Sequence, residues 1–176
     1  KMTALFDMVL LKEPRSEKFE ELMALGFRHF GPVYWYNRCL GCSQCVPARV
    51  LVNKFSLSRS QKRIVKKNRD LAVEIGLPLF TEEKYKLFFA HGKKFAYSGG
   101  ATHSRDEFMS LFFDSSHSFC REYRYILGGR LIGVGYVDAT PHLFSSTYFF
   151  YDLSFPRRSL GRYSLLFELA RAKKAG

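Results

Sequence analysis

The residues with the clearest chemical potential are three cysteines at two-residue spacing, Cys39, Cys42 and Cys45. A reduced thiolate cluster of this kind suits Zn²⁺ or an iron–sulfur centre. A closed structural site takes four ligands, and the sequence offers both His29 and Cys120 as a fourth without choosing between them. The alternative is that the three are small buried residues in a tight turn, because free cysteine behaves as a small hydrophobe. The sequence requires no cofactor elsewhere.

A run of positive charge follows the cysteines. The basic side chains between residues 54 and 69 have no acidic neighbour, and on a helix Arg59, Arg63 and Lys66 or Lys67 line one face. Such a face can bridge phosphates, whereas solvated helix surfaces usually mix both signs. The whole chain carries 28 Lys and Arg against 16 Asp and Glu, a net charge of +12. This balance favours a polyanionic partner, with nucleic acid ahead of a membrane surface.

A third chemical signal is PRRSLGR at residues 156–162, which follows a predicted strand and opens a predicted helix. Free backbone N–H groups and the positive end of a helix dipole would lie there, ready for an anionic or polar ligand. The segment resembles the coenzyme-A pyrophosphate loop of GNAT acyltransferases at Arg158 and Gly161. Tyr163 stands where that loop has its second small residue, and a bulky side chain would crowd a pyrophosphate. The alternative is an ordinary helix start with solvated arginines.

These segments need a scaffold, and the patterning predicts one α+β domain with a mostly antiparallel sheet flanked by helices. Helices are expected at residues 17–25, from a Ser58 or Ser60 cap to about residue 75, at 82–90, at 105–113, and after Ser159. Strands are expected at 48–55, at 124–127 and 131–137 as a hairpin around Gly128 and Gly129, and at 143–151. A loop is expected around residues 98–100. Residues 1–76 would form the cysteine and basic-helix part of this single domain, 1–176, and residues 77–176 its sheet-rich part.

The start of the chain has no targeting signal that we can identify. Its apolar stretch is short and interrupted by Asp7, unlike a secretory signal or a membrane span. Clustered thiols in a chain rich in core residues also argue against a disulfide framework. We therefore expect a cytoplasmic protein with no membrane partner.

The order of the segments resembles a known family. The sequences LMALGFRHFG (residues 22–31), CLGCSQCVPAR, NKF and SRSQKRIVKKNRDL come in the first half, and GVGYVDATPHLFSSTYFFYDLSF and RRSLGRYSLLFELARAKKAG in the second. Together they are similar to the aminoacyl-tRNA–protein transferases, namely the bacterial leucyl-type aspartate/glutamate transferases and their arginyl relatives. The resemblance spans nearly the whole chain and implies a GNAT-like fold. Family members have further segments before the first helix and after the last, so we expect either that this chain is partial or that the protein has lost part of its site.

The resemblance implies transfer of leucine or arginine from aminoacyl-tRNA to the N-terminal Asp or Glu of acceptor proteins, a step of an N-degron pathway. The acceptor's α-amine attacks the ester that joins the amino acid to the tRNA, so the enzyme must position both reactants, take up a proton and stabilise an oxyanion. Asp152 is the candidate proton-handling carboxylate, with Tyr148 hydrogen bonding beside it. The alternative for Asp152 is a strand-end residue that caps a turn.

Other residues are candidates for binding the reactants. Arg49 and Arg59 would hold the acidic side chain of the acceptor, because a guanidinium pairs naturally with a carboxylate. The remaining candidates for contact with the acceptor, the ester or the terminal adenosine are Gln61, Ser146, Ser159, Leu160 and Gly161. The candidates for contact with tRNA phosphates are Arg63, Lys66 and Lys67.

Two other functions stay open from the sequence. An acetyl-CoA-dependent N-acetyltransferase would have the same broad architecture, although Tyr163 and the separate basic helix count against it. A noncatalytic RNA-binding module would keep the basic face without a working site. The sequence does not decide between leucine and arginine, nor the oligomeric state, nor whether metal is bound.

Overall fold

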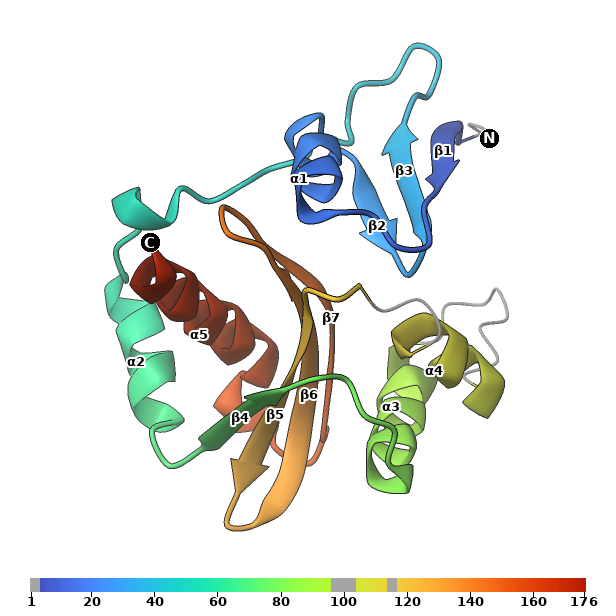
Figure 1. Cartoon of the computed structure of the whole chain (residues 1–176). Helices are drawn as coiled ribbons and strands as arrows, with labels where there is room; N and C mark the ends of the chain where they lie inside the picture. Colours follow the sequence, from blue (N-terminus) through green and yellow to red (C-terminus); the bar gives the residue numbers. More distant parts are fainter. Residues whose placement is uncertain (1–3, 96–103, 114–116) are drawn as a thin grey trace.

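The computed structural model describes residues 4–95, 104–113 and 117–176, and it contains two antiparallel sheets (Figure 1). The first has the order β1-β3-β2, and its strands are β1 (Phe6–Leu10), β2 (Arg28–Phe30) and β3 (Val33–Asn37). The second has the order β4-β5-β6-β7, and its strands are β4 (Ala72–Gly76), β5 (Cys120–Leu127), β6 (Arg130–Ala139) and β7 (Phe144–Tyr151). All pairings are antiparallel. The α+β class with antiparallel strands is confirmed, with the strands divided between two sheets.

The helices are α1 (Ser16–Ala24), α2 (Arg59–Lys67), α3 (Glu82–Phe95), α4 (Arg105–Phe112) and α5 (Leu160–Ala175). Figure 1 shows α2 and α5 on one side of the larger sheet, α3 and α4 on the other, and α1 with the smaller sheet. Short 3₁₀ turns, η1 (Val52–Lys54) and η2 (Pro156–Arg158), precede α2 and α5. Within the described residues, no helix has the length and apolar character needed to cross a membrane.

The larger sheet is covered on both faces by apolar side chains. Tyr125 and Val137 pack with Leu160 and Tyr163 of α5 on one face. The other face is almost entirely aromatic and joins β6 and β7 to the helices through Phe88, Phe108, Phe112, Tyr136 and Phe150. Burial of these side chains is the main favourable term that holds the helices to the sheet.

One buried ion pair crosses the aromatic face. The Nζ atom of Lys84 on α3 lies 2.6 Å from Oε1 of Glu122 on β5, and the two side chains are 3% and 1% exposed. Lys84 also donates to the carbonyl of Leu79, and Tyr136 donates to the second carboxylate oxygen of Glu122. Arg124 Nε lies 3.7 Å from the same carboxylate oxygen, so Lys84 is the nearer of two cations. The pair fixes the position of α3, because loss of Glu122 would leave the buried Lys84 ammonium without a counter-charge.

Two local signals in the sequence produce the expected elements. Ser58 and Gln61 form a reciprocal capping box at the start of α2, with Ser58 N donating to Gln61 Oε1 at 2.8 Å. Gly128 and Gly129 adopt φ angles of 54° and 82° in the β5–β6 turn, the positive values that a two-residue hairpin needs. These interactions are local, so the sequence predicts them well.

Two predicted elements are wrong. The strand expected at 48–55 is an extended segment ending in η1, and Val50 and Leu51 are 55% and 59% exposed, so no neighbouring strand covers them. The helix expected to reach about residue 75 ends at Lys67, because β4 pairs with β5 over 72–76. The strands β1 to β3 were not expected. The loop expected at 98–100 lies outside the described residues.

A bulge in β7 decides which side chains face α5. Tyr136 pairs with Tyr148 and Val137 pairs with Ser146, so Thr147 is the extra residue on its strand. An extra residue shifts the inward and outward alternation by one. Ser146 therefore shares a face with Phe149 and Tyr151, although an even spacing would have placed it with Tyr148.

Candidate active site

A cavity of about 330 Å³ opens where β7, α3 and the first turns of α5 meet. Its lining residues are His91, Ser146, Phe149, Tyr151, Gly161, Ser164 and Leu165. The bulge in β7 contributes Ser146 to this wall, and Gly161 leaves room beside Tyr151, since a Cβ on the glycine would lie 3.9 Å from that ring. The cavity combines an aromatic wall with a few polar groups, as small-molecule sites usually do.

The start of α5 supplies hydrogen-bond donors to this cavity. Arg162 N and Tyr163 N donate to the carbonyl of Ser159, so the N–H groups of Leu160 and Gly161 are the ones without an intrahelical acceptor at the positive end of the dipole. Ser159, which precedes the helix, adopts a left-handed conformation with φ of 53°, and its side chain makes no capping hydrogen bond. Strained non-glycine residues of this kind occur often at functional sites. Leu160 is 1% exposed and packs in the core, so of the predicted residues at this helix start Gly161 is the one that lines the cavity.

A buried carboxyl group lies behind the cavity. Glu168 on α5 is 5% exposed, and its pKa is raised from 4.5 to about 7. Burial is the cause of this rise, and a hydrogen bond from Ser146 lowers the pKa by a smaller amount. Tyr123 and Tyr125 on β5 are close enough that the charge of Glu168 contributes to raising the pKa of each tyrosine. Its Oε1 and the hydroxyl of Tyr125 have no hydrogen-bond partner among the described residues. A carboxyl group that titrates near neutrality and touches a cavity-lining serine is suited to accept a proton.

The sequence reasoning did not identify Glu168. Its position in the sequence could have identified it. Glu168 lies one helical turn after Ser164 and two turns after Leu160, so it shares the buried face of α5 with them. A charged residue at such a position is usually paired or functional. His91 and Tyr151, whose rings are 4.9 Å apart, were also missed as cavity residues.

The structure corrects the roles expected for Asp152 and Tyr148. The carboxylate of Asp152 forms an ion pair with Arg130 and accepts a hydrogen bond from Ser154 N at 2.9 Å. Partial burial raises the Asp152 pKa, but the hydrogen bonds from Ser154 and the charge of Arg130 outweigh it, so the pKa is lowered overall. Asp152 therefore fits the alternative role, a cap at the end of β7. Tyr148 is not beside it: its ring packs with Phe30 and Phe112 on the opposite face of the sheet.

The basic face expected on α2 is present. Arg63 and Lys66 are exposed, and the end of α2 is attached to the loop that precedes α5. Lys67 Nζ donates to the carbonyl of Arg157 at 2.7 Å, and Arg158 donates two hydrogen bonds of 2.8 Å to the carboxylate of Asp70. A second cavity, of about 440 Å³, lies in this corner between Lys67 and residues 154–158. The basic face and the start of α5 are thus held together.

Some of the other predicted binding residues make structural contacts, and others line the first cavity. Arg49 donates to the carbonyl of Ala24 at 2.9 Å, at the end of α1, and Gln61 is part of the α2 cap. These contacts are structural. Arg59 is exposed and has no ion pair in the described part of the chain. Ser146 and Gly161 line the first cavity, and their contact with a substrate stays a prediction.

The cysteines do not gather into a ligand group. Cys39 and Cys42 are half-buried and Cys45 is exposed, and all three are free thiols. Among residues 4–95, 104–113 and 117–176, a different group brings three possible ligand atoms within 4.8 Å of one another. It contains His29 and no cysteine. The thiol site therefore stays a prediction, and His29 belongs elsewhere.

Tyr163 does not crowd the turn before α5. It is 7% exposed and packs against Tyr125, with ring centroids 6.0 Å apart. The crowding expected against a pyrophosphate therefore does not occur. Arg158, the other residue of the GNAT-like loop motif, is instead engaged by Asp70.

Comparison with known proteins connects this geometry to a family. The model described as "Arginine-tRNA-protein transferase, C terminus" matches residues 83–176, and the corresponding N-terminus model matches residues 3–63. The aspartate/glutamate leucyltransferase of Stutzerimonas stutzeri (strain A1501) is 39% identical over 158 residues, which cover 90% of this chain and 67% of that protein. The protein of the same name from Pseudomonas fluorescens (strain Pf0-1) is 38% identical over 160 residues, with the same coverage. The chain spans about two thirds of the length of these relatives.

Proposed function

This chain belongs to the arginine-tRNA–protein transferase family of aminoacyltransferases, and from that premise we propose that it transfers leucine or arginine from aminoacyl-tRNA to the N-terminal Asp or Glu of acceptor proteins. The observation that carries the proposal is the attachment of the cationic face of α2 to the loop that precedes α5, through Lys67 and beside the 440 Å³ cavity. The first turns of α5, which follow that loop, line the 330 Å³ cavity.

The charged tRNA would lie along α2. The positively charged side chains of Arg63 and Lys66 are exposed to solvent. Arg157, in the turn before α5, is a third exposed cation on the same side. Phosphate contacts of this kind supply affinity without reading sequence, which suits a protein that must hold an acceptor end common to many tRNAs. The aminoacyl ester would then enter the 330 Å³ cavity beside Ser146 and Gly161.

The reaction needs few groups because the ester is already activated. The acceptor amine attacks the carbonyl carbon, a C–N bond forms, and the C–O bond to the ribose breaks. The N–H groups at the start of α5 would stabilise the oxyanion, and the proton of the amine would pass to Glu168, whose pKa of about 7 suits that task. The same proton would then pass from Glu168 to the departing ribose oxygen, which leaves as a hydroxyl group and restores the carboxylate. We assign Glu168, rather than Asp152, to proton acceptance, because Arg130 already neutralises Asp152.

The acceptor's first side chain would be recognised by a guanidinium. Arg59 has the free donors for this, whereas part of the Arg49 guanidinium is engaged at α1. An arginine whose carboxylate is replaced by a methyl group loses a charge-assisted hydrogen bond worth about 1.5 to 3 kcal/mol. That difference corresponds to selection of about tenfold to a hundredfold.

The test supplies the protein with radiolabelled Leu-tRNA, Arg-tRNA or acetyl-CoA and with peptides that differ only at their first residue, Asp, Glu, Ala or Asn. We expect label from one of the two tRNAs on the Asp and Glu peptides alone. Label from acetyl-CoA would establish the N-acetyltransferase instead, and binding of tRNA with no label from any donor would establish an RNA-binding module. Equal labelling of Asp and Ala peptides would contradict recognition of the acidic side chain.

A further inference from the structure

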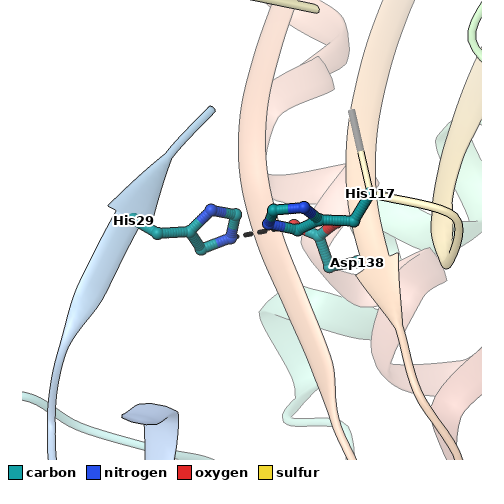
Figure 2. A group of neighbouring side chains, drawn as sticks. All are labelled: His29, His117 and Asp138. Atoms are coloured by element: carbon teal, nitrogen blue, oxygen red, sulfur yellow. Dashed lines mark ion pairs between the residues drawn. The ribbon is translucent and has the colours of Figure 1, made fainter. Parts of the chain in front are cut away.

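A second cluster of reactive side chains lies where the two sheets meet. His29 on β2 of the smaller sheet faces Asp138 on β6 of the larger sheet, and His117 lies just before β5. One ligand atom from each of the three lies within 4.8 Å of the other two. In Figure 2 the His29 imidazole points across the junction toward the His117 imidazole and the Asp138 carboxylate. The proposed transfer reaction does not use these residues.

The cluster is shielded from water, and its hydrogen bonding is incomplete. His29, His117 and Asp138 are 9%, 4% and 2% exposed. His29 Nε2 lies 2.9 Å from Asp138 Oδ2, yet this nitrogen makes no aligned hydrogen bond, and neither does His117 Nδ1, among the described residues. Buried polar groups of native proteins nearly always have a partner. Two unpartnered ring nitrogens beside one buried carboxylate are therefore a feature to be explained.

The neighbouring groups orient these side chains without neutralising Asp138. Tyr34 OH is 2.7 Å from His117 Nε2, and Thr147 Oγ1 donates to Asp138 Oδ2 at 2.9 Å. The thiol of Cys120 also hydrogen bonds to this carboxylate. None of these groups carries a positive charge. The ring of Phe19 covers the cluster, with its centroid 5.1 Å from the centroid of the His29 ring. A buried carboxylate normally requires a positive charge close by, from a side chain or from a metal ion.

We propose that His29, His117 and Asp138 bind one divalent transition-metal cation of the Zn²⁺ type, which joins the smaller sheet to the larger one. Two imidazoles and one carboxylate are a donor set that Zn²⁺ and related ions accept. A partner on one nitrogen of a ligating histidine holds the ring and leaves the other nitrogen for the metal, as Tyr34 does for His117. The cation would neutralise Asp138 and supply both unpartnered nitrogens with a ligand bond.

The site differs from the one that the cysteines suggested. His29 is opposite Tyr34 in the β2–β3 ladder, and Cys39 lies five residues further along the chain. Five residues of extended chain span roughly 16 Å, too far for a shared ion. The two sites can therefore be separated by mutation, and a protein that lacks the three clustered thiols should still bind the metal.

The experiment uses that separation. The variant carrying Cys39→Ser, Cys42→Ser and Cys45→Ser is stripped with a chelator, incubated with Zn²⁺, gel-filtered and analysed for metal by mass spectrometry. We expect about one equivalent of Zn²⁺. Co²⁺ in its place should give visible d–d absorption without the near-ultraviolet band of a thiolate ligand. No retained Zn²⁺ would overturn the proposal and leave the cluster as an ion pair of protonated His29 with Asp138.

Matched variants in the same background locate the ion. His117→Gln and Asp138→Asn should weaken Zn²⁺ binding by at least about a hundredfold, the upper end of what loss of a second-shell partner costs. His142→Gln, which removes an exposed imidazole, should bind Zn²⁺ normally. Retention of Zn²⁺ by both ligand variants would overturn the proposal. If those variants fail to fold, NMR of the triple Cys→Ser protein decides: Zn²⁺ must shift the ring resonances of His29 and His117 but not of His142, and unchanged rings would reject the site.

Discussion

Replacement of Glu168 by glutamine should make the protein more stable at alkaline pH and less active. Glutamine keeps the shape of the side chain and stays neutral, so it mimics the protonated carboxyl group that burial favours. The folded pKa of about 7 compares with 4.5 for an unperturbed glutamate. At 1.36 kcal/mol per pH unit, this difference corresponds to about 3 kcal/mol of unfolding free energy.

The sign follows from proton binding. Between pH 4.5 and about 7 the folded protein holds a proton on Glu168 that the unfolded chain releases. This contribution to stability is therefore fully present below pH 4.5 and is lost as the pH rises through about 7. The Glu168 carboxyl is hydrogen bonded to Ser146 and lies near Tyr123 and Tyr125, and the Arg171 guanidinium is engaged by Tyr123. Burial is the main cause of the raised Glu168 pKa, and the hydrogen bond from Ser146 offsets only part of it.

The assay is urea unfolding of wild type and Glu168→Gln at about pH 5 and about pH 8.5. The stability difference between the two proteins should be small at the lower pH and reach about 3 kcal/mol in favour of glutamine at the higher. Glu13→Gln, at an exposed loop position, is the matched control and should show no such change. Transfer of leucine or arginine by Glu168→Gln should fall by about a hundredfold or more, because an amide cannot accept the proton. A pH-independent stability difference would refute the burial argument, and unchanged turnover would refute the proton-accepting role.

Three further predictions concern other parts of the molecule. Arg63→Glu should weaken tRNA binding and make the slope of log affinity against log salt shallower by about 1, in fluorescence anisotropy titrations; an unchanged slope would exclude a phosphate contact. Lys84→Met should lower the free energy of unfolding by about 3 kcal/mol, because the buried Glu122 carboxylate loses its nearest cation and keeps only Arg124 Nε, 3.7 Å away; a loss below about 1 kcal/mol in urea unfolding would contradict this. Gly133→Ala should displace Phe149, because an atom of the Phe149 ring would lie 3.1 Å from the new Cβ. The displaced cavity wall should raise KM for aminoacyl-tRNA, while circular dichroism should show that the overall fold is retained. Unaltered kinetics would show that the cavity wall tolerates the shift.

Local interactions and segment order were determined by the sequence itself. The capping box of Ser58 and Gln61 and the two glycines of the β5–β6 turn depend on neighbours in the chain, so their patterns predict α2 and the hairpin. The one-signed charge of α2 and the resemblance across the chain likewise require no coordinates. The family models and curated relatives agree with that resemblance.

Contacts between distant segments were decided only by the tertiary structure. Residues 72–76 form a strand rather than the end of a helix, because the edge of β5 supplies partners for their backbone. The bulge at Thr147 turns Ser146 toward α5, and the packing of α5 on the sheet buries Glu168 and brings its pKa near neutrality. His29 and Asp138 meet because two sheets that the sequence did not separate are packed together. Burial and electrostatics depend on what surrounds a side chain, and for these residues the surroundings come from parts of the chain that no local pattern connects.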